Sequence, residues 1–133
     1  NRRGLPAISI SDPSFLTCAA NDFGFEFVFS RFIEANAIKG DLLLAISTSG
    51  ASANILKACE VAKKTGLKVV TLTGKDNSPV SKLADIDICT ANGKYSDRIQ
   101  ELHTLVIHIL VELIEESLFK WIHFFINCQI ISK

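Results

Sequence analysis

One stretch constrains the fold of this 133-residue chain more than any other: an apolar run at 42–46 that ends in a cluster of hydroxyl side chains around Gly50. An amphipathic segment follows at 53–65. This order predicts a buried strand, a Ser/Thr/Gly loop and a helix that begins at the loop. Backbone N–H groups at such a helix N-terminus attract an anion, and the helix dipole adds to the attraction. The stretch therefore predicts a phosphate-binding loop, with an ordinary strand–turn–helix and a serine N-cap as the plain alternative.

The loop offers hydroxyl groups and no positive charge. Ser47, Thr48, Ser49 and Ser52 can each donate a hydrogen bond to a phosphate oxygen. No Lys or Arg lies in the loop, so it does not match the nucleotide P-loop, which needs Gly-Lys-Ser/Thr. Neutral donors suit a sugar phosphate monoester better than a triphosphate with its metal ion.

Other apolar runs extend the pattern to a parallel sheet. We expect strands at 5–10, 41–47, 68–73 and 86–90. Helices are predicted at 25–37, 53–65 and 96–119, with one or two helical turns at 15–20. Apolar strands that alternate with helices are typical of a parallel α/β sheet with helices on both faces. Ligands of such sheets bind outside the carboxyl ends of the strands, where 47–52 and 73–77 lie.

The bulk composition limits the classes of partner. The chain contains 14 Lys plus Arg and 14 Asp plus Glu, so its formal net charge is zero. This balance argues against binding of nucleic acid or anionic lipid through a broad positively charged surface. The four cysteines form no C-x-x-C pair and fit reduced thiols in a cytosolic protein. The apolar stretch after Leu102 is interrupted by His108 and Glu112, so we expect no membrane span. A chain that starts at Asn1 and contains no methionine indicates a fragment or a processed piece.

The long helix predicted at 96–119 carries a polar stripe. On a helical wheel, one side gathers Asp97, Gln100, Glu101, Thr104 and His108. His103 lies at the edge of the apolar side and is predicted to be packed. Apolar residues flank His108, and an imidazole held there is poised for acid–base chemistry near neutral pH. The plain alternative is a solvated helix face.

Four segments together resemble the phosphoheptose isomerases of the sugar isomerase (SIS) domain superfamily. They are Asn-Asp-Phe-Gly-Phe at 21–25, the loop region 40–52, Val-Thr-Leu-Thr-Gly-Lys-Asp at 70–76, and the segment 95–108, which contains Asp-Arg-Ile-Gln-Glu-x-His-x4-His. The resemblance covers residues 1–120 and implies a partial SIS domain, a flavodoxin-like parallel sheet flanked by helices that is N-terminally truncated. Residues 121–133 form an apolar tail without a counterpart in the family.

The resemblance implies a cytoplasmic, homotetrameric aldose–ketose isomerase of lipopolysaccharide heptose biosynthesis. Such enzymes convert sedoheptulose 7-phosphate to glycero-manno-heptose 7-phosphate through an enediol. Carried over by motif, the phosphate would be bound by Ser47, Thr48, Ser49 and Ser52, and the sugar by Asp22 and Asp97. His108 would be an acid–base catalyst and, with Gln100, a zinc ligand in zinc-bearing members. These two residues lie about 12 Å apart along one helix, so they can bind the same zinc ion only if their side chains extend toward each other.

The chain also departs from the family. The family's upstream loop, its glutamate base and further ligands would precede Asn1, while Ala51 replaces an Asn and Asn77-Ser78 replace a glycine pair. We therefore expect the polypeptide alone to hold half of a site and to be weakly active or inactive. Two alternatives stay open: a non-catalytic SIS module that binds a sugar phosphate, and one that binds a replication-initiator protein. Gln100 and His108 favour the isomerase, since a scaffold need not keep them.

Overall fold

The computed structural model describes the backbone of residues 4–90 and 95–130, and the side chains of this set up to residue 119. The chain divides into two compact units, Asn1–Asn92 and Gly93–Lys133. The first holds the sheet and three α-helices, and the second is built on one long helix.

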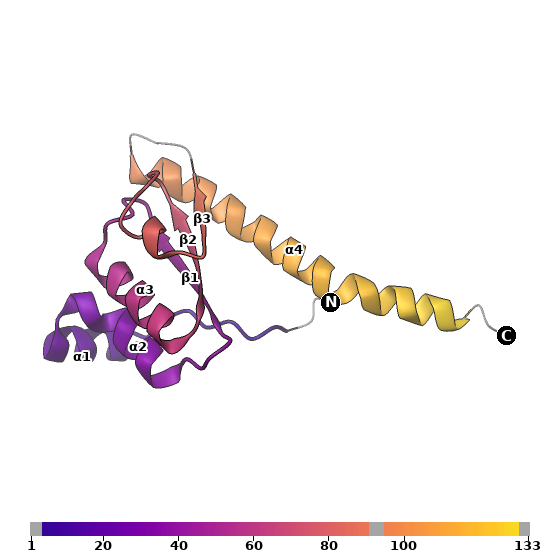
Figure 1. The fold of residues 1–133 in the computed structure, drawn as a ribbon, viewed down its shortest axis with the longest axis horizontal. Coiled ribbons are helices and arrows are strands. Elements are labelled where there is room, and N and C mark those ends of the chain that lie inside the picture. The colour runs from indigo at the N-terminus through magenta and orange to yellow at the C-terminus, as the bar shows by residue number, and fades with distance from the viewer. Residues whose placement is uncertain (1–3, 91–94, 131–133) are drawn as a thin grey trace. The chain divides into compact units, whose positions relative to one another are not determined.

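A three-stranded parallel sheet forms the centre of the first unit (Figure 1). Its strands lie side by side in the order β1 (Leu42–Ser47), β2 (Lys68–Thr73) and β3 (Ile86–Cys89). The register places the ends of β1 and β2 level, since Ser47 pairs with Thr73. The predicted parallel α/β sheet is confirmed, and the loops after β1 and β2 leave the same edge.

The strand predicted at 5–10 is wrong. Residues 4–12 have no regular secondary structure, and both Leu5 and Ile8 are exposed. A strand needs a neighbour that exchanges backbone hydrogen bonds with it, and in residues 4–90 and 95–130 the ladders join only β1, β2 and β3. Pro6 also lacks a backbone donor.

Helix α3 (Ala53–Thr65) packs against one face of the sheet. It ends where predicted, because Gly66 adopts the left-handed conformation (φ 84°, ψ 22°) and its N–H bonds back to the last turn. The core between α3 and the sheet contains small and branched apolar side chains: Ile33, Ala45, Ala58, Cys59, Ala62, Leu67, Val69 and Val80. The opposite face of the sheet presents Leu42, Leu44, Ile46 and Ile86, all exposed.

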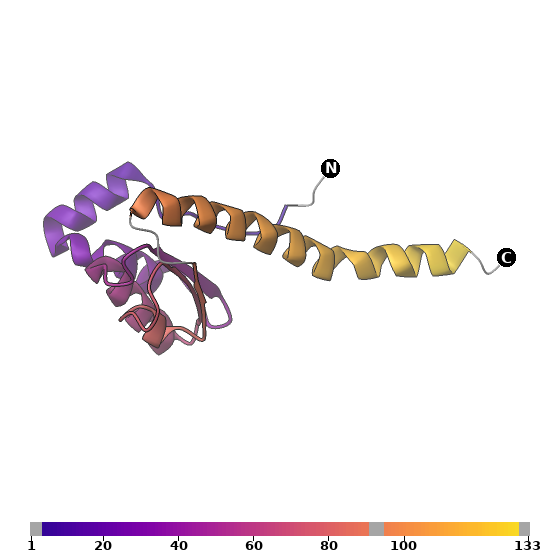
Figure 2. The same ribbon diagram turned by 90° about the horizontal axis from the view of Figure 1, so that it is seen from above.

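Two further helices complete the layer on the α3 side. α1 (Pro13–Phe23) begins at Asp12, whose Oδ1 accepts a hydrogen bond from Phe15 N at 2.7 Å, and it stops at Gly24. A short 3-10 turn, η1 (Phe25–Phe27), then leads into α2 (Val28–Asn36). Figures 1 and 2 show α3 between α2 and the sheet. The helix predicted at 25–37 is therefore split into η1 and α2, and α1, α2 and α3 lie on one face of the sheet.

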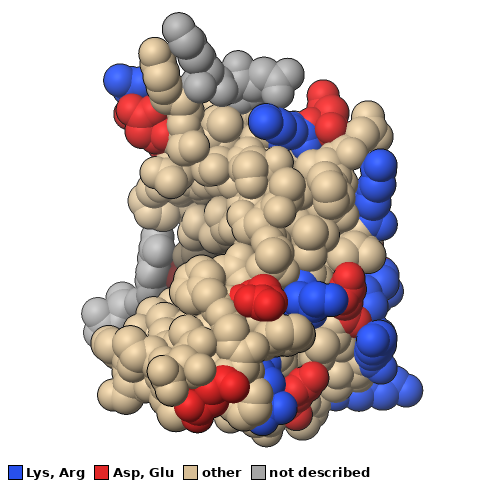
Figure 3. All heavy atoms as spheres, turned by 90° about the vertical axis from the view of Figure 1, so that its left-hand side faces the viewer, with Lys and Arg blue, Asp and Glu red and all other residues tan. Residues whose placement is uncertain are grey.

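Charges of both signs are mixed on the surface of this helical layer. Figure 3 looks onto the side of α1, α2 and α3, where most of the visible surface is uncharged. Acidic side chains lie among the basic ones, and several Lys and Arg follow the right-hand edge of the view. This mixture agrees with the balanced composition of 14 acidic and 14 basic residues.

The second unit is one helix, α4 (Ser96–Ile130), of 35 residues. It continues beyond the predicted end at 119 because the sequence from 96 to 130 contains neither Gly nor Pro to stop it. The backbone of the tail predicted at 121–133 is therefore helical as far as residue 130, and its last three residues lie outside the described residues. Among the helices of the described residues, none is both long and apolar enough for a bilayer span.

Candidate functional site

The loop between β1 and α3 brings the four predicted phosphate ligands together. Ser47 is the last residue of β1 and Ser52 the residue before α3, with Thr48 and Ser49 between them. The hydroxyls of Ser47 and Ser52 lie 3.1 Å apart, so a hydrogen bond joins the two ends of the loop. Ser47 is buried, Thr48 and Ser52 are half-buried, and Ser49 is exposed. The bottom of the loop is therefore a buried hydroxyl, that of Ser47, whereas the outer part of the loop is accessible to a ligand.

The first turn of α3 begins at this loop and contains backbone N–H groups that have no hydrogen-bond partner among the described residues. Ser52 has the extended N-cap conformation, and its carbonyl accepts from Leu56 N at 3.0 Å, yet its hydroxyl makes no capping bond. Ile55 N–H bonds to the Asn54 side chain at 2.9 Å. Within the described residues, the N–H groups of Ala53 and Asn54 have no partner. Two helix-terminal donors therefore remain for an anion.

Gly50 lets the loop close against the turn that follows β2. Its φ of 63° is in the left-handed region, and its N–H donates to both the carbonyl (3.2 Å) and the hydroxyl (3.1 Å) of Ser47. Its carbonyl accepts from Val80 N at 2.9 Å. A Cβ at this position would clash with Cβ and Oγ of Ser78, so the contact requires glycine.

A polar cluster that sequence reasoning missed lies at the same edge of the sheet. Asp87 of β3 accepts hydrogen bonds from the buried hydroxyls of Thr71 and Thr73 on β2. A shallow cavity of about 410 Å³ lies beside it, lined by Asp76, Asn77, Ser81, Lys82 and Asp87. The sequence signal was an aspartate inside an otherwise apolar strand, Ile-Asp-Ile-Cys.

Asp22, predicted to bind the sugar, is exposed near the end of α1. Its carboxylate accepts a hydrogen bond from the Cys18 thiol at 3.6 Å and from Asn21 Nδ2 at 2.9 Å, both on the same helix. The hydrogen bond and the negative charge of Asp22 raise the pKa of the Cys18 thiol. The role of Asp22 toward a sugar stays a prediction.

The other predicted residues, Asp97, Gln100 and His108, are all exposed on α4. Asp97 Oδ1 accepts from the backbone N–H of Arg98 at 2.9 Å in the first turn of the helix. His103 is 3% exposed, as expected for a packed histidine. Neither of its ring nitrogens has a hydrogen-bond partner among the described residues.

The described residues do not make a complete zinc site. Zinc is usually held by four ligands, whereas Gln100 and His108 offer at most two, about 12 Å apart along α4 by the helical rise. No group of three or more His, Cys, Asp or Glu within the described set is placed to hold a metal ion.

Comparison with known proteins agrees with the resemblance. Residues 33–111 match the SIS domain family. The chain is 58% identical over 120 residues to a phosphoheptose isomerase of Photorhabdus laumondii, covering 90% of this chain and 62% of that protein. A phosphoheptose isomerase structure from Francisella tularensis superposes with a TM-score of 0.81 at 34% identity, over 86% of this chain and 62% of the other. The phosphoheptose isomerase structure from Neisseria gonorrhoeae superposes with a TM-score of 0.72 at 39% identity, over 78% of this chain and 59% of the other. The chain thus spans about three fifths of the length of these relatives.

Proposed function

Because the chain belongs to the SIS domain family, we propose that it is the phosphate-binding and acid–base portion of a phosphoheptose isomerase. The observation that carries the proposal is the Ser47–Ser52 contact at 3.1 Å, which turns the N-cap hydroxyl away from α3. With this hydroxyl turned away, Asn54 N–H has no capping partner, and it remains free for an anion together with Ala53 N–H. The similarity to named phosphoheptose isomerases over nine tenths of the chain supports the choice of substrate class.

The phosphate of the sugar would sit over the loop, at the N-terminus of α3. Thr48 and Ser49 hydroxyls and the two free N–H groups would donate to its oxygens, and the helix dipole would add to the attraction. Ser47 and Ser52 would line the bottom of this phosphate-binding loop. Hydrogen bonds to a charged acceptor are stronger than neutral ones, so a few such donors can hold a dianion without a lysine.

The proposed substrate is sedoheptulose 7-phosphate, and the proposed product is glycero-manno-heptose 7-phosphate. In this isomerisation a base removes the proton on the carbon beside the carbonyl and an enediol forms. An acid then delivers a proton to the neighbouring carbon. His108 is our candidate for one acid–base group, since histidine is the side chain that most often transfers protons in catalysis. Asp22 and Asp97 would bind sugar hydroxyls. For zinc, Gln100 and His108 would supply two ligands, and the remainder would come from outside the described residues.

We also propose a homotetrameric, cytoplasmic enzyme. Several large apolar side chains on α4 are exposed, among them Leu105, Leu113 and Leu118, and exposed apolar surface of this kind favours subunit contact. The described cysteines, Cys18, Cys59 and Cys89, are all free thiols, in keeping with a reducing compartment. Light scattering on the purified chain tests the oligomeric state.

The decisive experiment measures sedoheptulose 7-phosphate turnover by this chain and by His108→Ala, with and without added zinc. Turnover that disappears in His108→Ala supports the isomerase. No turnover, together with stabilisation by phosphate that Ser49→Ala removes, would leave a sugar-phosphate-binding module. A chain that shows neither turnover nor stabilisation by phosphate would contradict the proposal.

A further inference from the structure

In the turn after β2, the side chain of Ser78 packs against Gly50 in the loop between β1 and α3. We propose that Ser78 is a positioning residue: it occupies the space beside Gly50 and thereby sets the conformation of the loop that would receive the phosphate. This inference rests on the proposed function, because it concerns the same loop. It adds a residue outside the β1–α3 segment on which phosphate affinity depends.

The contact between the two segments is close and directional. Gly50 is buried, and its carbonyl accepts a hydrogen bond from Val80 N at 2.9 Å. The Cβ and Oγ of Ser78 fill the volume where a Gly50 side chain would lie. Without those two atoms, the nearest atom to a Cβ at Gly50 would be Ser78 Cα at 3.8 Å, an ordinary contact. The Ser78 side chain alone therefore closes this space.

Ser78 is itself held in place from its other side. It is 5% exposed. Its Oγ accepts from Ser81 N at 3.2 Å, and its carbonyl accepts from Ser81 Oγ at 2.9 Å and Lys82 N at 3.2 Å. The preceding residue, Asn77, adopts a left-handed φ of 53°. Because these hydrogen bonds hold both its backbone and its hydroxyl, Ser78 limits how far Gly50 can move toward the turn.

A displacement at Gly50 would reach the phosphate donors directly. The Gly50 N–H binds the carbonyl and the hydroxyl of Ser47, and that hydroxyl binds Ser52 at the start of α3. Moving Gly50 away from Ser78 would therefore alter both ends of the loop. Binding sites tolerate such shifts poorly, since small misplacements of positioned groups reduce their effect.

The test compares a single with a double substitution on the full chain, with inorganic phosphate as the probe. Gly50→Ala should weaken phosphate binding by about tenfold, because the new methyl group overpacks against Ser78. Adding Ser78→Gly should recover part of that loss, because it removes the two clashing atoms while the strain of an alanine at φ 63° remains. Gly40→Ala is the matched control: Gly40 also has a positive φ, 103°, but no atom lies within 4 Å of its absent Cβ. It should leave phosphate binding unchanged.

The outcomes separate the two proposals. If the unsubstituted chain binds no phosphate, the proposed function fails and this inference fails with it. If the chain binds phosphate but the double variant is no better than Gly50→Ala, the inference alone is overturned. Should Gly50→Ala not fold, a folded double variant that binds phosphate supports the steric coupling, and a double variant that is also unfolded overturns it.

Discussion

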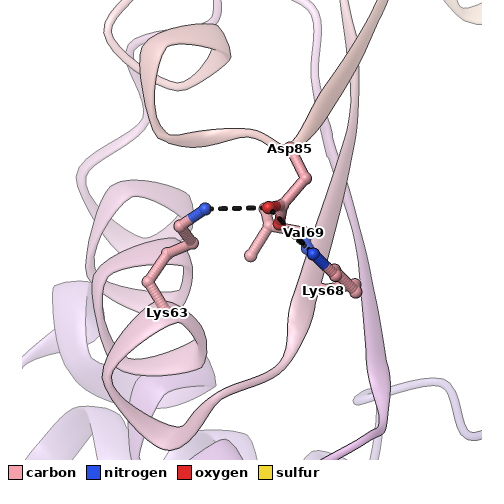
Figure 4. Close-up of polar contacts among 4 residues, drawn as sticks. All are labelled: Lys63, Lys68, Val69 and Asp85. Atoms are coloured by element: carbon pink, nitrogen blue, oxygen red, sulfur yellow. Dashed lines mark hydrogen bonds and ion pairs between the residues drawn. The ribbon is translucent and has the colours of Figure 1, made fainter.

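Asp85 accepts a hydrogen bond from the backbone N–H of Val69 at 2.8 Å, so a side chain at the start of β3 is bonded to the backbone of β2 (Figure 4). The same carboxylate pairs with Lys63 of α3 at 3.1 Å and with Lys68 at 3.6 Å. One aspartate thus joins the helix to two strands at the amino edge of the sheet. The phosphate loop lies at the opposite, carboxyl edge, which leaves its donors free of this anchor.

The Asp85 anchor predicts a pH-dependent loss of stability. The hydrogen bond from Val69, and then the ammonium of Lys63, lower the pKa of Asp85 below its ordinary value of 3.8. A carboxyl with a depressed folded-state pKa stabilises the protein above its unfolded pKa, and that contribution is lost as pH falls through the folded value. Asp85→Asn should therefore lower the melting temperature at pH 7, and the difference should shrink below about pH 4.

Thermal unfolding between pH 3 and pH 7 measures this effect. Glu34→Gln is the control, because Glu34 forms a half-exposed pair with Arg31 at 3.6 Å, and such surface pairs contribute little. A deficit in Asp85→Asn that stays constant down to pH 3 would show that the charge of Asp85 plays no part.

The core between α2, α3 and the sheet predicts a large difference between two isoleucines. Ile33 is 3% exposed and belongs to the core, whereas Ile38 is 69% exposed. Ile33→Ala should reduce the free energy of unfolding by about 2–5 kcal/mol, because it leaves a cavity. Ile38→Ala should change it by less than about 0.5 kcal/mol. Urea denaturation gives both values, and equal effects would contradict the packing of α2 on α3.

Much of the fold could be predicted from the sequence, because its main elements carry local signals. The bounds of α3 and β2 match the prediction, since amphipathic spacing and Gly66 define the helix and a run of branched residues defines the strand. The strand at 5–10 failed because a strand depends on a neighbour, which no local pattern reveals. The loop serines were predicted from one segment. Ser78 was not, since its contact with Gly50 joins two turns that only the sheet register brings together.

Burial predicts that Cys59 is chemically inert in the folded protein. The side chain is fully buried on α3, and this burial raises its pKa to about 11. Because the thiolate is the reactive form, Cys59 should resist alkylation by iodoacetamide at pH 8 until the chain unfolds. Cys18 is exposed and serves as the internal reference. Peptide mapping by mass spectrometry measures both sites, and modification of native Cys59 as fast as Cys18 would contradict the observed core.

Two of the helix N-caps in the first unit, those of α1 and α3, should respond differently to the same kind of substitution. Asp12 caps α1 through its side chain, with 2.7 Å between Oδ1 and Phe15 N. Asp12→Ala should therefore cost about 0.5–2 kcal/mol of stability. Ser52 makes no such bond, because its hydroxyl is 3.1 Å from Ser47 Oγ instead. Ser52→Ala should cost less stability than Asp12→Ala, and yet only Ser52→Ala should weaken phosphate binding.

Urea denaturation and titration calorimetry with inorganic phosphate separate these two effects. The N–H groups of Ala53 and Asn54 stay in place in Ser52→Ala, so we expect a reduced affinity rather than a complete loss. The substitution removes the neutral hydrogen bond to Ser47 that fixes the two ends of the loop. A neutral hydrogen bond contributes about 1 kcal/mol, and a loss of that size from phosphate binding corresponds to a roughly fivefold change in affinity. If Ser52→Ala destabilised the chain as much as Asp12→Ala and left phosphate affinity unchanged, Ser52 would be an ordinary helix cap, and the loop would lose the observation that marks it as an anion site.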